Sequence, residues 1–117
     1  MSRTVLIVDD HAAFRERARA LLQDDGFEVV GEACDGDAAV EAARRLRPQI
    51  VLLDVRLPGI DGFEVAGRLA AGPDPPAVVL ISSRAASTYR RRLRGSPARG
   101  FIAKTELSGE RLSALLG

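Results

Sequence analysis

The stretch Val51–Val65, VLLDVRLPGIDGFEV, joins a predicted strand to a predicted helix through a loop that begins with a carboxylate. Its first residues are aliphatic, which is typical of a parallel strand covered on both faces. Asp54 follows, and Pro58, Gly59 and Gly62 predict a tight, irregular loop before the helix. Taken alone, Asp54 would most simply cap that helix. The rest of the chain decides between a cap and a chemical role.

Apolar runs and helical segments alternate along the chain. The apolar runs predict strands at Thr4–Val8, Phe27–Ala33, Ile50–Leu53, Ala77–Ile81 and Gly100–Ala103. Apolar spacing and start and stop signals predict helices at His11–Gln23, Asp37–Leu46, Phe63–Ala70, Ala85–Arg94 and after Ser108, the expected N-cap of the last helix. Such alternation favours a parallel sheet with helices on both faces. We therefore predict an α/β fold, one doubly wound domain over residues 1–117.

Composition limits the class of protein. The chain has 46% hydrophobic and 28% charged residues, which fits a globular domain, and its net charge of +1 gives no overall attraction to nucleic acid or membrane. No apolar run reaches the roughly 18 residues of a membrane span. Met1 lies too close to the first strand for a signal peptide, so we expect a cytoplasmic protein. The single cysteine, Cys34, excludes an internal disulfide, and we expect its thiol to be buried and inert.

Polar side chains follow four of the five apolar runs. They are Asp9, Asp10, Asp54, Ser82, Ser83 and Lys104. The carboxyl ends of parallel strands meet at one edge of the sheet, where ligands bind. Each residue also has a plain structural reading: Asp10 as a helix cap, Ser82 as a turn hydroxyl, Lys104 as a solvated charge. Their recurrence at strand ends favours one shared site.

Three neighbouring carboxylates repel one another unless a cation lies between them. Mg²⁺ is a small, hard dication that suits one or two carboxylates together with phosphate oxygens, and Mn²⁺ is an alternative. The candidate metal ligands are Asp9, Asp10 and Asp54. The rigid loop would add the backbone carbonyl of Arg56.

Beside such a metal, Asp54 could act as a carboxylate nucleophile and form an acyl phosphate. Lys104 could bind the phosphoryl oxygens through its charge, and Ser82 through a hydroxyl hydrogen bond. Phosphoryl transfer mainly requires positioning and charge neutralisation, and these side chains could supply both. The pattern therefore indicates phosphoryl transfer to Asp54.

The sequence resembles the receiver domains of two-component response regulators over essentially its whole length. The matching stretches are VLIVDDHAAFR, IVLLDVRLPGIDGFE, VVLISSR and RGFIAK. The resemblance implies a flavodoxin-like (βα)5 fold with strand order 2-1-3-4-5. It is nearest to the subfamily that usually carries a C-terminal helix-turn-helix DNA-binding domain, and the chain ends at Gly117 without one. A stand-alone receiver and a shortened regulator are both compatible with this.

The resemblance implies a phosphorylation-activated switch rather than an enzyme. Asp54 would accept a phosphoryl group from a sensor histidine kinase or a phosphotransfer protein, with the metal and phosphoryl contacts on the residues named above. Ser82 would then move toward the phosphate and Phe101 would turn inward, although Phe101 could equally be a core residue of the last strand. Arg56 and Arg84 occupy positions that flank the route of the hydrolytic water, and would set phosphate lifetime.

Three positions qualify the resemblance. Thr105 stands where the family often has proline after the lysine, so we expect a trans peptide bond there. Phe101 lacks the hydroxyl of the commoner tyrosine. His11 follows the acidic pair, and we interpret it as an exposed residue of the first helical turn.

Arginines dominate the segment from Arg84 to Arg99, which contains no acidic residue. A solvated helix face is the simplest interpretation. The alternative is a docking surface for an acidic partner, an output domain or a second copy, because in the family helix 4, strand 5 and helix 5 report phosphorylation. Direct nucleic-acid binding is not expected, since Tyr89 is the only aromatic residue interleaved with these charges.

Other functions fit less well. A haloacid-dehalogenase-type phosphatase needs a second aspartate two residues after Asp54, where this chain has Arg56. A flavodoxin-type cofactor carrier needs a phosphate-binding loop after the first strand, which is missing. A receiver-like interaction module that acts without phosphorylation is the remaining alternative. It would normally have lost Asp54, Lys104 or one acid of the pair.

Overall fold

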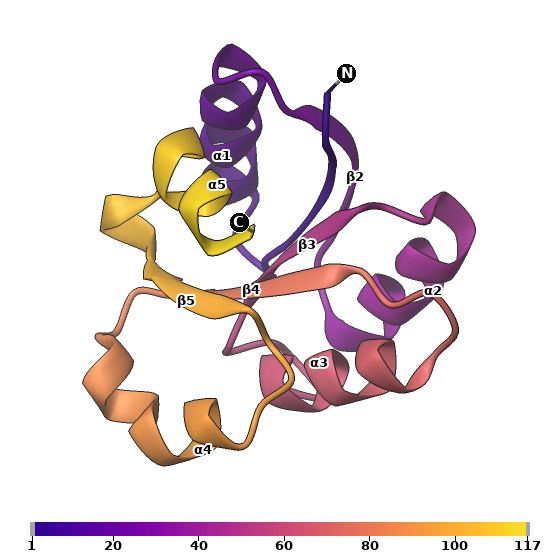
Figure 1. Cartoon of the computed structure of the whole chain (residues 1–117), viewed down its shortest axis with the longest axis vertical. Helices are drawn as coiled ribbons and strands as arrows, with labels where there is room; N and C mark the ends of the chain where they lie inside the picture. Colours follow the sequence, from indigo (N-terminus) through magenta and orange to yellow (C-terminus); the bar gives the residue numbers. More distant parts are fainter. Residues whose placement is uncertain (1, 117) are drawn as a thin grey trace.

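The computed structural model describes residues 2–116, and within them the chain forms one parallel sheet in the order β2-β1-β3-β4-β5 (Figure 1). The strands are β1 (Thr4–Val8), β2 (Glu28–Ala33), β3 (Ile50–Asp54), β4 (Ala77–Ser82) and β5 (Gly100–Ala103). The predicted fold class and strand order are confirmed. Because the order reverses between β1 and β3, the carboxyl ends of these two strands flank the switch point where open α/β sheets bind ligands.

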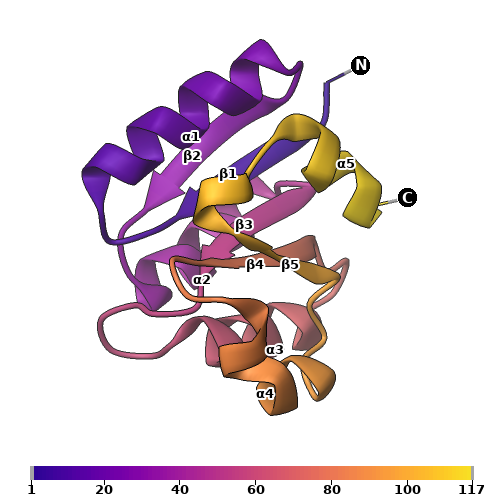
Figure 2. The same ribbon diagram turned by 90° about the vertical axis from the view of Figure 1, so that its left-hand side faces the viewer.

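Helices cover both faces of the sheet. They are α1 (Ala12–Asp24), α2 (Gly36–Leu46), α3 (Gly62–Ala71), α4 (Arg90–Arg94) and α5 (Gly109–Leu116). Figure 2 shows α1 and α5 on one side of the sheet and α2, α3 and α4 on the other. Side chains alternate along each strand, so Ile7, Leu52 and Ile81 pack toward α1 and α5. Their neighbours Leu53 and Leu80 pack toward α2 and α3, and all five side chains are fully buried.

The fourth helix is shorter than the sequence predicts. The predicted helix over Ala85–Arg94 is instead a 3₁₀ turn, η1 (Ala86–Tyr89), followed by the five-residue α4. Neither piece has a fully buried residue, and neither begins with a side-chain cap. A longer helix needs tertiary packing or capping to be stable, and this segment offers little of either.

Cys34 is exposed, so the prediction of a buried thiol is wrong. The apolar run that suggested burial ends at Ala33, the last residue of β2. Cys34 is the first residue beyond that strand, which lies at the edge of the sheet.

Two smaller expectations also have an outcome. No cis peptide bond occurs within residues 2–116, which confirms the trans bond at Thr105. The hydroxyl of Ser108 accepts the Arg111 N–H at 3.1 Å, as expected of a residue that caps the last helix. Of the helices in the described part of the chain, none combines the length and the apolar character of a transmembrane segment.

Glu32 on β2 joins the sheet to α1 through two ion pairs. Its carboxylate oxygens lie 2.9 Å from Arg15 Nε and 2.8 Å from Arg19 Nε. Partial burial would raise the pKa of Glu32, but the hydrogen bonds and charges of Arg19 and Arg15 outweigh it and lower the pKa below its ordinary value of 4.5. The ionised form is therefore favoured in the folded state.

We expect Glu32→Gln to lower the free energy of unfolding at pH 7 by about 0.5–1 kcal/mol, since partly exposed ion pairs are screened by water. A depressed carboxyl pKa stabilises the fold above the unfolded value and loses that effect as the pH falls through the folded value. The difference from wild type should thus shrink below about pH 4.5. Urea unfolding at several pH values measures it, with the exposed Glu28→Gln on the same strand as control. A pH-independent difference would contradict the charge assignment.

Candidate functional site

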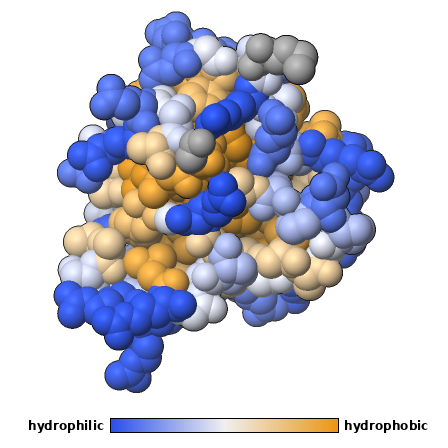
Figure 3. Space-filling view, in the orientation of Figure 1, coloured by the Kyte–Doolittle hydropathy of each residue, from blue (hydrophilic) through white to orange (hydrophobic). Residues whose placement is uncertain are grey.

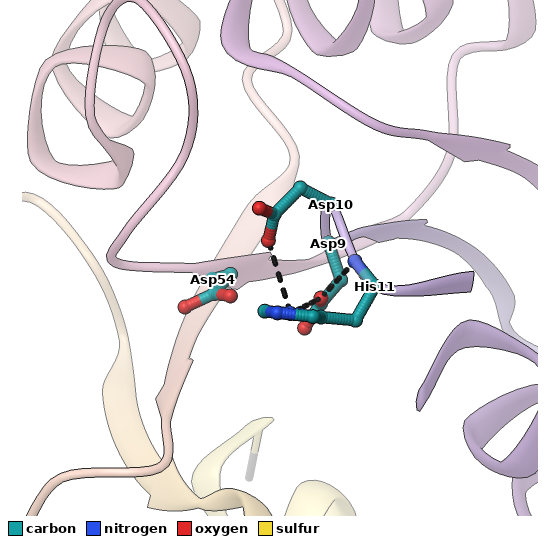
Figure 4. Close-up of side chains that lie close together, drawn as sticks. All are labelled: Asp9, Asp10, His11 and Asp54. Carbon is teal, nitrogen blue, oxygen red and sulfur yellow. Dashed lines mark hydrogen bonds and ion pairs between the residues drawn. The ribbon is translucent and has the colours of Figure 1, made fainter. Parts of the chain in front are cut away.

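The acidic residues predicted to converge do so at the carboxyl ends of β1 and β3. Asp9 directly follows β1 and Asp54 is the last residue of β3, and these strands are neighbours in the sheet. Figure 4 shows both carboxylates together with those of Asp10 and the ring of His11. One ligand atom from each of these four residues lies within 4.8 Å of all the others.

Asp9 is fully buried, and its two oxygens have different partners. Oδ1 accepts the His11 N–H at 2.8 Å. Oδ2 faces Lys104 Nζ, which lies 2.5 Å away in an ion pair. A buried carboxylate needs a positive partner, and here the ammonium of Lys104 supplies it.

Asp54 is held by a hydrogen bond on each oxygen. Oδ1 accepts the Arg56 N–H at 3.1 Å and Oδ2 accepts Lys104 Nζ at 3.1 Å. Burial raises the pKa of Asp54, and the neighbouring Asp9 adds to the rise, against the lowering effects of the Arg56 N–H and Lys104. The residue is only 4% exposed. An ionised Asp54 is therefore costly in the bare protein, and a bound cation would offset that cost.

Asp54 does not cap the following helix. Asp61 is the N-cap of α3, and its Oδ1 accepts the Glu64 N–H at 3.0 Å. Likewise His11, not Asp10, occupies the N-cap position of α1, where no side-chain cap bond forms. The structural alternatives for Asp54 and Asp10 are thus wrong, and both carboxylates are available to the acidic cluster.

Lys104 follows β5 and reaches across the end of the sheet to both buried carboxylates. Its Nζ also lies 4.6 Å from the centre of the Phe14 ring on α1, a cation–π distance. Burial alone would lower the pKa of Lys104, but the hydrogen bonds and charges of Asp9 and Asp54 outweigh it and raise the pKa. The ammonium therefore stays charged and supplies the fixed positive charge of the site.

His11 is exposed, as the sequence predicts, but its contacts were missed. Its side chain is 70% exposed, and its Nδ1 lies 3.2 Å from Asp9 Oδ1 and 3.1 Å from Asp10 Oδ1. The only signal in the sequence was its place directly after the acidic pair.

Ser82 ends β4, and its hydroxyl contacts Arg84 and Tyr89 rather than the acidic cluster. The residue is 1% exposed. Its Oγ accepts the Arg84 N–H at 3.0 Å and lies 3.3 Å from the phenol oxygen of Tyr89. Among the described residues no hydrogen bond connects it to Asp54 or Asp9. The contact with Tyr89 was not foreseen, because an arginine-rich segment gave no reason to place an aromatic ring beside the serine.

Three further residues from the sequence analysis lie near Asp54 and Ser82. They are Phe101, the predicted switch residue, and Arg56 and Arg84, which are predicted to set phosphate lifetime. Phe101 is half-buried on β5, with its ring centre 6.2 Å from that of Tyr89. Arg56 and Arg84 are exposed, and each donates its backbone N–H to the functional side chain two residues before it, Asp54 and Ser82 respectively. Their side chains make no ion pair among residues 2–116.

The donor set decides which group these residues fit. Asp9, Asp10 and Asp54 offer carboxylate oxygens that lie within 4.8 Å of one another. Oxygen ligands suit hard cations such as Mg²⁺ and Mn²⁺ rather than soft metals. The residues present therefore fit the hard dication that the sequence predicts.

The chain matches the response regulator receiver domain family over residues 5–116. BvgA of Bordetella pertussis, described as a positive transcription regulator of virulence factors, is 38% identical over 114 residues, or 97% of this chain and 54% of that protein. The chain thus spans about half the length of this relative. The receiver domain of the response regulator NarL from Mycobacterium tuberculosis is 37% identical with a TM-score of 0.83, covering 99% of this chain and 98% of that one.

A LuxR-family two-component response regulator from Aurantimonas has a TM-score of 0.87 at 26% identity, over 99% of this chain and 84% of that one. Sequence and backbone agree along almost the entire chain, and the acidic cluster lies at the sheet edge where the predicted site belongs. The chain belongs to the family of response regulator receiver domains, the regulatory modules of two-component signal transduction.

Proposed function

We propose that residues 1–117 form a phosphorylation-activated switch in which Asp54 accepts a phosphoryl group from a sensor histidine kinase or a phosphotransfer protein. The observation that carries the proposal is the setting of Asp54. It is a buried carboxylate at the sheet's switch point, held between the Arg56 N–H and the Lys104 ammonium and next to the buried carboxylate of Asp9. A purely structural aspartate has no need of this arrangement.

In the proposed step, an oxygen of Asp54 attacks phosphorus, the P–N bond of the phosphohistidine breaks, and an acyl phosphate forms. Lys104 neutralises charge on the phosphoryl oxygens, and Ser82 donates a hydrogen bond to one of them. Attack of water on phosphorus later restores the carboxylate. Arg56 and Arg84, exposed beside these residues, set the rate of that hydrolysis. The chain is regulatory rather than an enzyme with a separate product.

Asp9, Asp10 and Asp54, with the backbone carbonyl of Arg56, would hold Mg²⁺, or Mn²⁺ in its place. When bound, the ion neutralises the charge that gathers on phosphoryl oxygens during transfer. The protein's own contribution is to fix the carboxylates and to keep Lys104 charged beside them.

Phosphorylation in the test tube separates this proposal from a receiver-like interaction module that acts without phosphate. The protein is incubated with Mg²⁺ and acetyl phosphate, and the labelled residue is located by mass spectrometry after borohydride trapping. We expect one phosphoryl group on Asp54, and none when the metal is removed by chelation. A protein that no small phosphodonor labels would support the interaction module.

Asp10→Asn should weaken Mg²⁺ binding by at least tenfold while leaving the fold intact. Asp10 is exposed, and apart from the ion pair with His11 its side chain serves no structural contact within the described residues, so the lost charge acts on the metal. Isothermal titration with MgCl₂ and the Mg²⁺-dependent rise in melting temperature measure the effect. Asp24→Asn, an exposed aspartate at the end of α1, is the control and should bind like wild type. Equal affinities for both variants would place the metal elsewhere.

The arginine-rich face around α4 is the proposed output surface. Figure 3 shows strongly hydrophilic side chains at the lower left, where Figure 1 places α4. Among the described residues Arg90, Arg91 and Arg94 pair with no carboxylate, whereas Arg92 pairs with Asp61. Unpaired charge of one sign suits an acidic partner. We propose that the face formed by α4, β5 and α5 contacts a downstream protein, an attached DNA-binding domain or a second copy, and that no direct nucleic-acid contact is involved.

A further inference from the structure

Tyr89 contacts the switch hydroxyl directly. Its phenol oxygen lies 3.3 Å from Ser82 Oγ, in a hydrogen bond for which either atom can be the donor. Tyr89 is the last residue of η1, seven positions after Ser82, and its side chain is partly buried. Nothing in the phosphoryl-transfer chemistry described above uses this residue.

The Tyr89 ring is held in place by its neighbours. Its centre lies 5.9 Å from that of Phe63 on α3 and 6.2 Å from that of Phe101 on β5, both in tilted geometry. Arg92 stacks on Phe63, one of these two rings, with its guanidinium 4.2 Å from the centre of the ring. Arg92 also forms an ion pair with Asp61. Aromatic pairs at such distances are attractive. The phenol is therefore aimed at Ser82 by a packed row of side chains.

The sheet register places Tyr89 and Asp54 on opposite sides of Ser82. Asp54 lies opposite Ile81 on the neighbouring strand, so these two side chains share the face covered by α1 and α5. Ser82 is the next residue and starts on the other face, toward Tyr89. The Ser82 Oγ atom lies on the side of Tyr89, so moving it toward a phosphoryl group on Asp54 takes it away from Tyr89, whichever of the two hydroxyls donates.

We propose that Tyr89 is a positioning residue that holds the Ser82 hydroxyl in the resting arrangement and competes with the phosphoryl group for it. Phe101 lacks the hydroxyl of the tyrosine that is commoner at its position. In this chain Tyr89, on the segment leading into α4, supplies an aromatic hydroxyl instead. When Ser82 leaves, the partly buried phenol loses its partner, and the η1–α4 segment is released with it. This inference rests on the proposed phosphorylation of Asp54.

The chain contains one tyrosine and no tryptophan, so its intrinsic fluorescence reports Tyr89 alone. Beryllofluoride with Mg²⁺, a mimic of the phosphoryl group, is titrated into wild type and into Tyr89→Phe, with binding followed by ¹⁹F NMR. We expect the tyrosine emission of wild type to change on binding. We expect Tyr89→Phe to bind about fivefold more tightly, the effect of deleting one competing neutral hydrogen bond.

Two further variants test whether Tyr89 acts through Ser82. In a Ser82→Ala background, Tyr89→Phe should have no effect on beryllofluoride affinity, because the competition is already gone. Thr88→Val, which removes an exposed hydroxyl one residue away, should bind like wild type. The inference would be overturned if Tyr89→Phe bound beryllofluoride no more tightly than wild type. It would also be overturned if Tyr89→Phe raised the beryllofluoride affinity equally in the presence of Ser82 and in the Ser82→Ala background. If wild type binds no beryllofluoride at all, the proposed function fails instead.

Discussion

Asp54→Asn should take up no phosphoryl group from acetyl phosphate under conditions that label wild type fully. An amide does not form an acyl phosphate, and the other carboxylates are poorly placed to replace it. Asp9 is fully buried and ion-paired with Lys104, and Asp10 is exposed beside His11. Mass spectrometry of the intact protein and its peptides measures the loss. Asp74→Asn, an exposed aspartate remote from the cluster, should be labelled like wild type.

The same substitution should make the metal-free protein more stable at neutral pH. Burial and Asp9 raise the pKa of Asp54, so the folded state binds this proton more tightly than the unfolded chain does. Stability therefore falls as the pH rises above the unfolded pKa, near 3.8, and through the higher folded value. Removing the carboxylate removes this cost. Urea unfolding without Mg²⁺ should give Asp54→Asn a higher free energy of unfolding than wild type at pH 7. This difference should disappear at acidic pH. A less stable variant would contradict the electrostatic account of the site.

Gly62→Ala should damage both the fold and the reactivity of Asp54. A Cβ atom on Gly62 would lie 2.3 Å from the backbone oxygen of Asp54 and 2.9 Å from the Cα of Val55. Both obstacles are backbone atoms, which cannot swing aside as a flexible side chain can. The Gly62 N–H also donates to the Val55 carbonyl at 2.8 Å, so the loop cannot open without losing that bond. We expect the free energy of unfolding to fall by about 3 kcal/mol, which is at the upper end of the range for substitutions that overpack a buried position.

Gly67 is the matched control for this prediction, because it is an exposed residue of the same helix. A Cβ atom on Gly67 would meet nothing within 4 Å. Gly67→Ala should therefore raise stability by roughly 0.5–1 kcal/mol, as expected for alanine in a helix interior. Urea unfolding and the rate of labelling by acetyl phosphate are measured for both variants. If Gly62→Ala has the stability and the labelling rate of wild type, the backbone of the loop can shift more easily than its contacts indicate.

The sequence was most informative about strand ends. Apolar runs of strand length located all five strands to within a residue, and the polar residues just beyond them converged because parallel strands bring their carboxyl ends together. Asp9 and Asp54 meet for this reason alone. Lys104 reaches them from the far edge of the sheet because it too follows a strand.

Contacts between distant segments could not be predicted in this way. The Ser82–Tyr89 pair depends on how a short, weakly packed segment folds back, and no periodicity encodes that path. Cys34 is exposed because it follows Ala33, the last residue of β2, and so lies beyond a strand at the edge of the sheet. Such errors arise where local composition and tertiary position disagree, at element boundaries and in segments without a buried face.

The strand order has a consequence for synthesis of the protein. β1 lies between β2 and β3, so the first strand made acquires its second neighbour only when β3 emerges, and Lys104 arrives last of all. Until Lys104 has been made, Asp9 and Asp54 lack the ammonium that pairs with both of them in the folded protein, and repulsion between like charges disfavours bringing the two carboxylates together. The acidic site is thus complete only once the residues up to Lys104 have been translated.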